Sequence, residues 1–251
     1  MSAVTPLLQK IILELQDFSS IESFALAGGT NLAIRYQHRV SIDIDFISPN
    51  IVGKEGFENI IFELQKSYGE KSVRAILMNE DLGNQFMFLR VFLTVSGEIL
   101  KIEFLQNMKC LYAFDIFESF RLVHLIDIGL FKLLSATKRF SKKDIYDLDF
   151  ITDEINLIEL FRYLEEKQTL YYLPEHRSLF DLDISKNLID CPEMLLEFDE
   201  IKKTKTFHTS HTHDRIDIFK HNKSWSEARI HWRQKVRQLF RNLNKPFPTL
   251  K

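Results

Sequence analysis

Cysteine is scarce in this sequence, and the two residues present, Cys110 and Cys191, stand far apart and outside any Cys-x2-Cys spacing. A disulfide framework and a zinc ribbon are therefore not expected. Glycine and proline are also few, at 8 and 6 residues in a chain of 251, which excludes collagen-like and low-complexity chains. The 45% of hydrophobic and 27% of charged residues are typical of a globular protein with one large domain or two small ones.

Long apolar runs are missing as well. No stretch approaches the roughly 18 consecutive apolar residues that a membrane helix requires. The N-terminal segment carries Gln9, Lys10, Glu14 and Asp17 within its apolar pattern, which is not the pattern of a signal peptide. We therefore expect a soluble, cytoplasmic protein with no membrane partner.

The net charge of -2 is unevenly distributed along the chain. The segment from Lys220 to the end holds nine basic residues against the single acid Glu227 and carries +8, so the remainder carries -10. Such asymmetry indicates a polyanionic partner, or a tail that docks on the acidic body of the protein. A solvated helix face is the alternative interpretation.

The period of the apolar residues changes along the chain and predicts an α+β protein. Strands are expected where apolar residues form short runs or alternate, at 24–27, 41–47, 72–78, 86–95 and 99–105. Helices are expected where they recur every three or four residues, at 5–18, 30–36, 54–68, 122–137, 143–151, 155–166 and 224–243. We predict a mixed sheet with flanking helices in residues 1–115 and a mainly helical domain in residues 116–251, which ends in a basic helix.

Two polar motifs in the first half carry candidate chemistry. Gly28 and Gly29 leave a strand just before a helix that begins at Thr30, and glycines at such a turn let backbone N–H groups approach a phosphate. Asp43 and Asp45 are two residues apart on a strand, so their carboxylates project from one face and repel each other unless a divalent cation lies between them. The alternative is an ordinary turn followed by a solvent-facing strand.

Three further positions add to these motifs. Glu103 lies in an apolar strand, where an adjacent strand would bring it beside the aspartates to complete a two-metal site; alternatively it faces water together with Lys101. Lys132 lies in the middle of a helix, where its ammonium reaches phosphate oxygens or snorkels at the helix edge. Asp144 and Asp147 share one face of the next helix, although Asp144 also suits a capping role.

The run Ala27-Gly28-Gly29-Thr30-Asn31-Leu32-Ala33-Ile34-Arg35, followed by His38-Arg39-x-Ser41-x-Asp43-x-Asp45-Phe46, resembles the signature of the AbiEii/AbiGii toxin family of nucleotidyltransferases. This family is a branch of the polymerase-beta-like superfamily. The segment from Asp127 through Lys132 to Arg139, followed by Lys143-Asp144-x2-Asp147-Leu148, is similar to the lysine helix and KDxxD motif of the same family. The resemblance covers about residues 5 to 170 and departs from the family pattern at Gln37, where the family often has Gly.

The resemblance implies a polymerase-beta-like nucleotidyltransferase core and an enzyme that moves a nucleoside monophosphate from an NTP to an acceptor. It implies Mg²⁺ or Mn²⁺ as cofactor, held by Asp43, Asp45 and Glu103, with Glu103 alternatively taking the proton of the acceptor. Lys132 is expected to bind the triphosphate, and Asp147 to complete the catalytic set by fixing Lys132, Arg139 or the sugar. The other expected nucleotide contacts are Gly28, Gly29, Thr30, Arg39, Ser41 and Asp144.

The same resemblance implies the toxin of an abortive-infection or toxin–antitoxin system, with a cognate antitoxin encoded nearby. RNA is the expected acceptor, first the 3′ end of tRNA because related MenT toxins act there. A protein hydroxyl or a small molecule is the alternative acceptor, and a catalytically inactive nucleotide-binding or protein-binding module is the alternative class. We expect His208, His211 and His213 to form a polar loop rather than a metal site, and Trp225 and Trp232 to form a packing face rather than a base-stacking platform.

Overall fold

A computed structural model of the chain describes residues 2–81, 83–139, 141–182, 186–199 and 215–248. The strands are β1 Ala25–Leu26, β2 Ile44–Ile47, β3 Val73–Met78, β4 Phe88–Val95, β5 Glu98–Leu105, β6 Asp115–Phe117 and β7 Phe120–Leu122. The α-helices are α1 Pro6–Gln16, α2 Gly28–Tyr36, α3 Gly53–Tyr68, α4 Gly83–Phe86, α5 Leu125–Arg139, α6 Lys142–Glu154, α7 Leu157–Leu170 and α8 Trp225–Asn242. Four 3-10 helices are η1 Ser19–Ile21, η2 Pro174–His176, η3 Leu179–Asp181 and η4 Pro192–Asp199. The expected loop around His208, His211 and His213 lies outside the described residues.

The strands form one mixed seven-stranded sheet in the order β3-β4-β5-β2-β1-β7-β6. β2 runs parallel to β5, and Asp45 is aligned with Glu103 across this pair. β4 runs antiparallel to β5 and aligns Arg90 with the same Glu103. The pairing therefore places Asp45, Glu103 and Arg90 in one row on one face of the sheet, because aligned residues on paired strands share a face.

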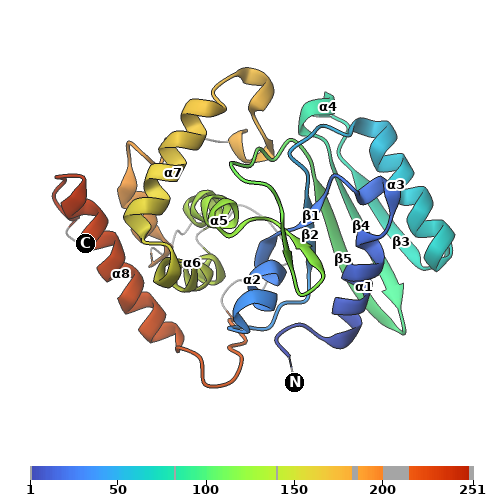
Figure 1. Cartoon of the computed structure of the whole chain (residues 1–251), viewed down its shortest axis with the longest axis horizontal. Coiled ribbons are helices and arrows are strands. Elements are labelled where there is room, and N and C mark those ends of the chain that lie inside the picture. The colour runs from blue at the N-terminus through green and yellow to red at the C-terminus, as the bar shows by residue number, and fades with distance from the viewer. Residues whose placement is uncertain (1, 82, 140, 183–185, 200–214, 249–251) are drawn as a thin grey trace.

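Helices cover both faces of the sheet, since alternate strand residues point to opposite sides. Residues such as Phe46 and Phe104 pack with α1 and α3 in one buried cluster. Ala25, Ala27 and Ile47 pack with α5 to α8 in a second cluster. The two groups of helices lie on opposite sides of the sheet in Figure 1, which confirms the α+β class with helices predominating in the second half.

Strand β2 is shorter than the expected strand 41–47. It begins at Ile44, and Ile42, expected to share a face with Ile44, is 66% exposed. The reason lies in the partners of the preceding segment: the N–H of Ser41 donates to the carbonyl of Ala3, and the N–H of Val40 donates to the carbonyl of Asp217. Residues 40–43 therefore run beside other segments before the chain joins the sheet.

The hairpin of β6 and β7 was not anticipated from the sequence, and it extends the sheet through residue 122. β7 pairs in parallel with β1 through Leu26 and Leu122. The helix expected from residue 122 accordingly begins at Leu125. The division into domains at 115/116 stays a prediction. The sheet continues past this boundary through β6 and β7.

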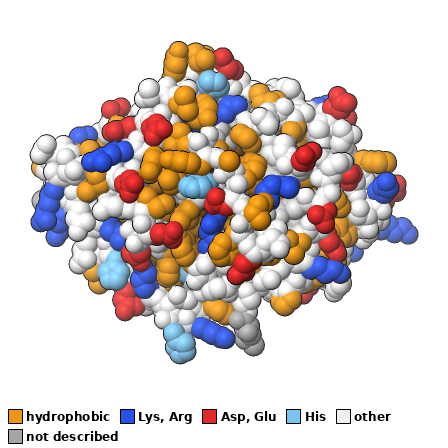
Figure 2. All heavy atoms as spheres, viewed as in Figure 1, with side chains coloured by type: hydrophobic (Ala, Val, Ile, Leu, Met, Phe, Trp, Pro, Cys, Tyr) orange, Lys and Arg blue, Asp and Glu red, His pale blue; other side chains and the backbone are white. Residues whose placement is uncertain are grey.

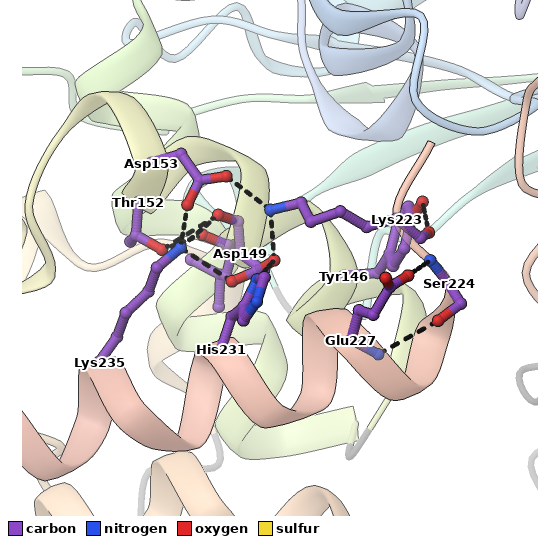
Figure 3. Close-up of polar contacts among 10 residues, drawn as sticks. Tyr146, Asp149, Thr152, Asp153, Lys223, Ser224, Glu227, His231 and Lys235 are labelled. Carbon is purple, nitrogen blue, oxygen red and sulfur yellow. Dashed lines mark hydrogen bonds and ion pairs between the residues drawn. The ribbon is translucent and has the colours of Figure 1, made fainter. Parts of the chain in front are cut away.

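The basic helix α8 docks on α6. Lys223 and Lys235 both bind the carboxylates of Asp149 and Asp153, with ion-pair distances of 2.5 to 2.8 Å (Figure 3). Trp232 is fully buried and donates its indole N–H to the carbonyl of Leu195 at 2.9 Å. Part of the basic tail is thus paired with the acidic body, and Trp232 has the packing role.

Charges of both signs are interspersed over the face of the molecule drawn in Figure 2. The separation of charge along the sequence therefore does not reappear as two halves of opposite charge on this face. Among the helices of the described residues, none is long and apolar enough to cross a bilayer.

Candidate active site

The turn between β1 and α2 brings backbone close to a carboxylate. Gly28 has a φ of +65°, which favours glycine, and a Cβ at this position would overlap Asp45 Oδ2. A Cβ at Gly29 would overlap the guanidinium of Arg39. Because only glycine fits at both positions, the N-terminus of α2 lies directly against Asp45 and Arg39.

Three carboxylates line one wall of a cavity next to this turn. Asp43 immediately precedes β2, Asp45 lies on β2, and Glu103 is aligned with Asp45 on β5. Burial and the nearby charge of Glu103 raise the pKa of Asp45 to about 6. The side chain of Asp45 makes no hydrogen bond or ion pair with the described residues. We call Asp43, Asp45 and Glu103 the acidic wall.

Two cations hold the acidic wall together. Arg90 contacts Glu103 Oε1 through Nη2 at 2.5 Å and Nε at 2.7 Å. Lys101 Nζ lies 3.1 Å from Glu103 Oε2 and 3.4 Å from Asp43 Oδ2. Burial opposes the ionisation of Glu103, but Lys101 and Arg90 outweigh it and hold its pKa below the usual value.

The sequence alone suggests that Lys101 faces water, yet its side chain is 15% exposed and lines the cavity. The spacing of two residues between Lys101 and Glu103 was the available signal, because such residues share a strand face. What the sequence does not give is the strand pairing that brings Asp43 within reach.

The opposite wall is basic and comes from α5 and α6. Lys132 Nζ binds Asp144 Oδ1 at 2.8 Å and Asp147 Oδ2 at 2.6 Å. Arg39 donates to Asp147 from Nε at 2.6 Å and from Nη2 at 2.7 Å. Arg139 Nη2 lies 2.9 Å from Asp144 Oδ2. Three cations thus share two carboxylates, which leaves this cluster with a net positive charge beside the cavity.

Asp147 makes the most contacts in this cluster, with His38, Arg39 and Lys132, and its side chain has no exposed surface. Burial opposes its ionisation, but Arg39 and Lys132 outweigh burial and hold its pKa well below the usual value. His38 Nε2 lies 2.8 Å from Asp147 Oδ1, and the ring stacks on Tyr146. Burial lowers the pKa of His38 despite this carboxylate, so the imidazole is neutral at pH 7.

The cavity between the two walls has a volume of about 260 Å³. Nine of the expected site residues line it: Gly28, Gly29, Arg39, Ser41, Asp43, Asp45, Glu103, Lys132 and Asp144. Two expected residues lie behind the lining. Asp147 is in the buried cluster. The hydroxyl of Thr30 donates to the carbonyl of Asp43 and accepts from Ser41 Oγ at 2.9 Å. Thr30 and Asp147 therefore hold lining residues from behind.

Sequence reasoning missed several lining residues besides Lys101. Arg139 and Lys143 line the cavity and add positive charge to it, and both stand in the segment that resembles the lysine helix and KDxxD motif. Asp217 lines the cavity from the far end of the chain. Its segment runs beside residues 38–40, where the N–H of Phe219 donates to the carbonyl of His38 at 2.9 Å. No local pattern signals this contact, because it joins segments far apart in sequence.

The carboxylates of the acidic wall have the chemistry that a divalent cation needs. Among the described residues, no three His, Cys, Asp or Glu side chains are grouped closely enough to hold a metal ion. Asp43 and Asp45 nevertheless offer hard oxygen donors at one side of the cavity. Burial and the charge of Glu103 both raise the pKa of Asp45, and a bound cation would favour its ionised form. The oxygen donors of these two residues are of the kind that Mg²⁺ and Mn²⁺ prefer.

Comparison with known proteins decides the family. The model of the family described as nucleotidyl transferase AbiEii toxin, type IV toxin–antitoxin system, matches residues 11–250. The chain belongs to this AbiEii family. It is therefore a nucleotidyltransferase that uses an NTP, and the resemblance read from its motifs is confirmed.

Among solved structures, the AbiEii chain is similar to MenT4, a nucleotidyltransferase toxin from Mycobacterium tuberculosis H37Rv. The two are 16% identical, the TM-score is 0.46, and the match covers 95% of this chain and 82% of MenT4. No curated protein matches the sequence.

Proposed function

We propose that the chain is a metal-dependent toxin that transfers a nucleoside monophosphate to RNA, with the 3′ end of tRNA as the first acceptor to test. The observation that carries the proposal is the pairing of the acidic wall with a basic wall across one cavity, beside a glycine turn at a helix N-terminus. Transfer of a nucleotidyl group needs both walls, because the acceptor is activated at carboxylates while the triphosphate is held by cations.

In this proposal the triphosphate lies along Lys132, Arg139 and Lys143, within reach of the backbone N–H groups that open α2. Asp43 and Asp45 would hold the divalent cation, which would supply activation of the acceptor hydroxyl and neutralisation of phosphate charge. The acceptor oxygen attacks the α-phosphorus, the bond to the β-phosphate oxygen breaks, and pyrophosphate leaves. The acidic wall receives the hydroxyl proton.

The remaining expected residues take supporting roles. Asp147 and Asp144 position Lys132, and Arg39 ties Asp147 to the segment that leads into Asp43. Glu103 lies beside Asp45, but Arg90 and Lys101 bind both its oxygens, so it joins the metal ligands only if these contacts open. Ser41 lines the cavity next to Asp43 and is fixed by Thr30.

RNA is favoured as acceptor over a protein hydroxyl or a small molecule because α8 exposes arginines such as Arg237 and Arg241, which suit a phosphate backbone. The intact acidic wall and Lys132 speak against an inactive binding module. The type IV description of the family points to a cognate antitoxin as partner. The cytoplasm, which holds both NTP and tRNA, is the proposed place of action.

The test is to incubate the purified chain with each α-labelled NTP, Mg²⁺ and total cellular RNA, and to digest the products with ribonuclease or protease. Label in ribonuclease-sensitive material of tRNA size, removable by a 3′ exonuclease, supports the proposal. Protease-sensitive label identifies a protein acceptor instead. The antitoxin can be tested separately by copurification.

A further inference from the structure

The side chains that line the cavity change from charged to apolar along β2 and β5, the strands that form its floor. Asp45 and Glu103 are aligned on β2 and β5, and the next residues on the same face are Ile47 and Leu105. Both also line the cavity. Because β2 and β5 are parallel, a step of about 7 Å leads on both strands from carboxylates to aliphatic side chains.

The wall formed by α5 shows the same change. Ile128 and Phe131 line the cavity near the start of the helix, whereas Ser135 and Arg139 line it farther on. These residues lie on one side of the helix and span about 16 Å along its axis. The end of the cavity nearest Ile128 is therefore apolar, and the end nearest Arg139 is basic.

We call the first region the apolar end; its residues are Ile47, Leu105, Met108, Ile128, Phe131 and Phe180. Phe131 and Phe180 supply its two aromatic rings, with centroids 6.2 Å apart and planes 21° from parallel. The cavity lining includes no Asn, Gln, Thr, Tyr or His among the described residues. The apolar end thus offers flat hydrophobic surface and no side-chain amide that could read the edge of a base.

Both rings are held in place by contacts outside the cavity. Lys167, which does not line the cavity, places its ammonium 3.9 Å from the centroid of the Phe131 ring. The carbonyl of Phe180 accepts a hydrogen bond from Lys138. Ser178 and Asp181 close a capping box around the turn that carries Phe180. Rings fixed in this way lose little conformational entropy when a flat ligand packs on them.

We propose that the apolar end binds the base of the NTP by stacking and apolar contact, so that the enzyme selects for ring size and not for the base edge. The inference rests on the proposed function, because it requires the triphosphate at the basic end. Larger rings bury more surface, so ATP and GTP bind alike and tighter than CTP and UTP. Selection of this kind stays within about 200-fold, whereas sites that hydrogen-bond a substrate group reach about 10⁴-fold.

The test measures binding, without turnover, of the four α,β-methylene NTP analogues and of inorganic tripolyphosphate, by calorimetry in Mg²⁺. Phe180→Leu removes one ring and keeps an apolar side chain, whereas Phe180→Tyr keeps an aromatic ring. Phe62→Leu is the matched control, because Phe62 is exposed on α3 across the sheet. Circular dichroism and a melting curve establish that each variant is folded.

Phe180→Leu should weaken all four nucleotides by about 5- to 50-fold, within the range for loss of a base–aromatic stack. Its affinity for tripolyphosphate should stay within about twofold, because the phosphates contact the other end. Phe62→Leu should bind as the parent does, and Phe180→Tyr, which keeps an aromatic ring, should lose less nucleotide affinity than Phe180→Leu.

Four results would overturn the inference alone. In the first three, Phe180→Leu binds nucleotides as the parent does, Phe180→Leu loses affinity for tripolyphosphate to the same extent, or the parent prefers one base by more than about 10³-fold. In the fourth, the parent binds tripolyphosphate at least as tightly as it binds every nucleotide. If the parent binds neither nucleotide nor tripolyphosphate, the proposed function itself fails.

Discussion

Replacing Asp45 with Asn should stabilise the metal-free protein while abolishing its activity. The folded state raises the pKa of this carboxyl to about 6 because Asp45 is half-buried in the cavity wall and lies next to Glu103. An acid whose pKa is raised by folding is harder to ionise in the folded state, so its ionisation reduces the stability of the fold. Asn has nearly the same shape and no charge, and no side-chain contact is lost with the described residues.

The magnitude follows from the shift of the pKa from 3.8 to about 6. A shift of about two units corresponds to about 3 kcal/mol, and we expect a gain of about 1–3 kcal/mol for Asp45→Asn above pH 7. For a chain of this size the melting temperature should rise by about 2 to 10 °C. The gain should shrink as the pH falls through 6, be small at pH 4, and vanish below about pH 3, where the parent carboxyl is protonated in both states.

The assay is thermal and urea unfolding of parent and variant in EDTA at pH 4, 6 and 8. Asp217→Asn provides a matched control, since Asp217 lines the same cavity and its carboxylate already binds Arg215. A variant that is less stable than the parent at pH 8, or a gain that does not depend on pH, would refute the electrostatic strain assigned to Asp45.

Three further predictions test the basic wall and the tail. Lys132→Ala should reduce kcat/KM by about 10²- to 10³-fold, the usual loss for one donor in a preorganised site, with Lys132→Arg restoring only part; unchanged turnover would remove the lysine from the site. Asp147→Asn should cost about 3–5 kcal/mol in urea unfolding at pH 7, because buried cations lose their partner. The loss should shrink below about pH 4, where the unfolded parent takes up a proton at this carboxyl while the folded parent does not; a loss equal at all pH values would contradict this account. Arg237→Glu with Arg241→Glu should flatten the salt dependence of RNA binding by about 1–2 in log-log slope and leave the affinity for NTP unchanged; a variant that instead only melts earlier would show that these arginines stabilise the fold.

The elements with a clear period were predictable from the sequence. β4 and β5 occupy nearly the expected ranges, because both segments are rich in apolar residues and the Ser96-Gly97 turn separates them. Short elements were not predictable: β6 and β7 have three residues each, and their pairing with β1 depends on contacts from another part of the chain. The start of β2 at Ile44, instead of at residue 41, also depends on contacts with distant parts of the chain.

The candidate site shows the same division between local and distant information. Gly28, Gly29, Asp43 and Asp45 stand out in the sequence because their spacing carries chemical meaning at short range. Neither the ion pair of Lys101 with Asp43 nor the approach of Asp217 has such a signal, since both arise from pairing between distant segments.

Burial also separates residues that share a motif. Thr30 and Asp147 stand in recognised motifs, and the structure places both behind the residues that line the cavity. A motif identifies residues that act together, but the packing of the folded chain decides which of them faces a ligand.

The most direct test of the central claim compares nucleotidyl transfer by the parent and by the double variant Asp43→Ala/Asp45→Ala. With α-labelled NTP, Mg²⁺ and total RNA, the parent should label an acceptor and the double variant should lose at least about 10³-fold in rate, because the cation and the acceptor then lack their ligands. The melting temperature of the double variant in EDTA should equal or exceed that of the parent, since like charges are removed. Label transfer that persists in a folded double variant would contradict the assignment of this cavity as the active site.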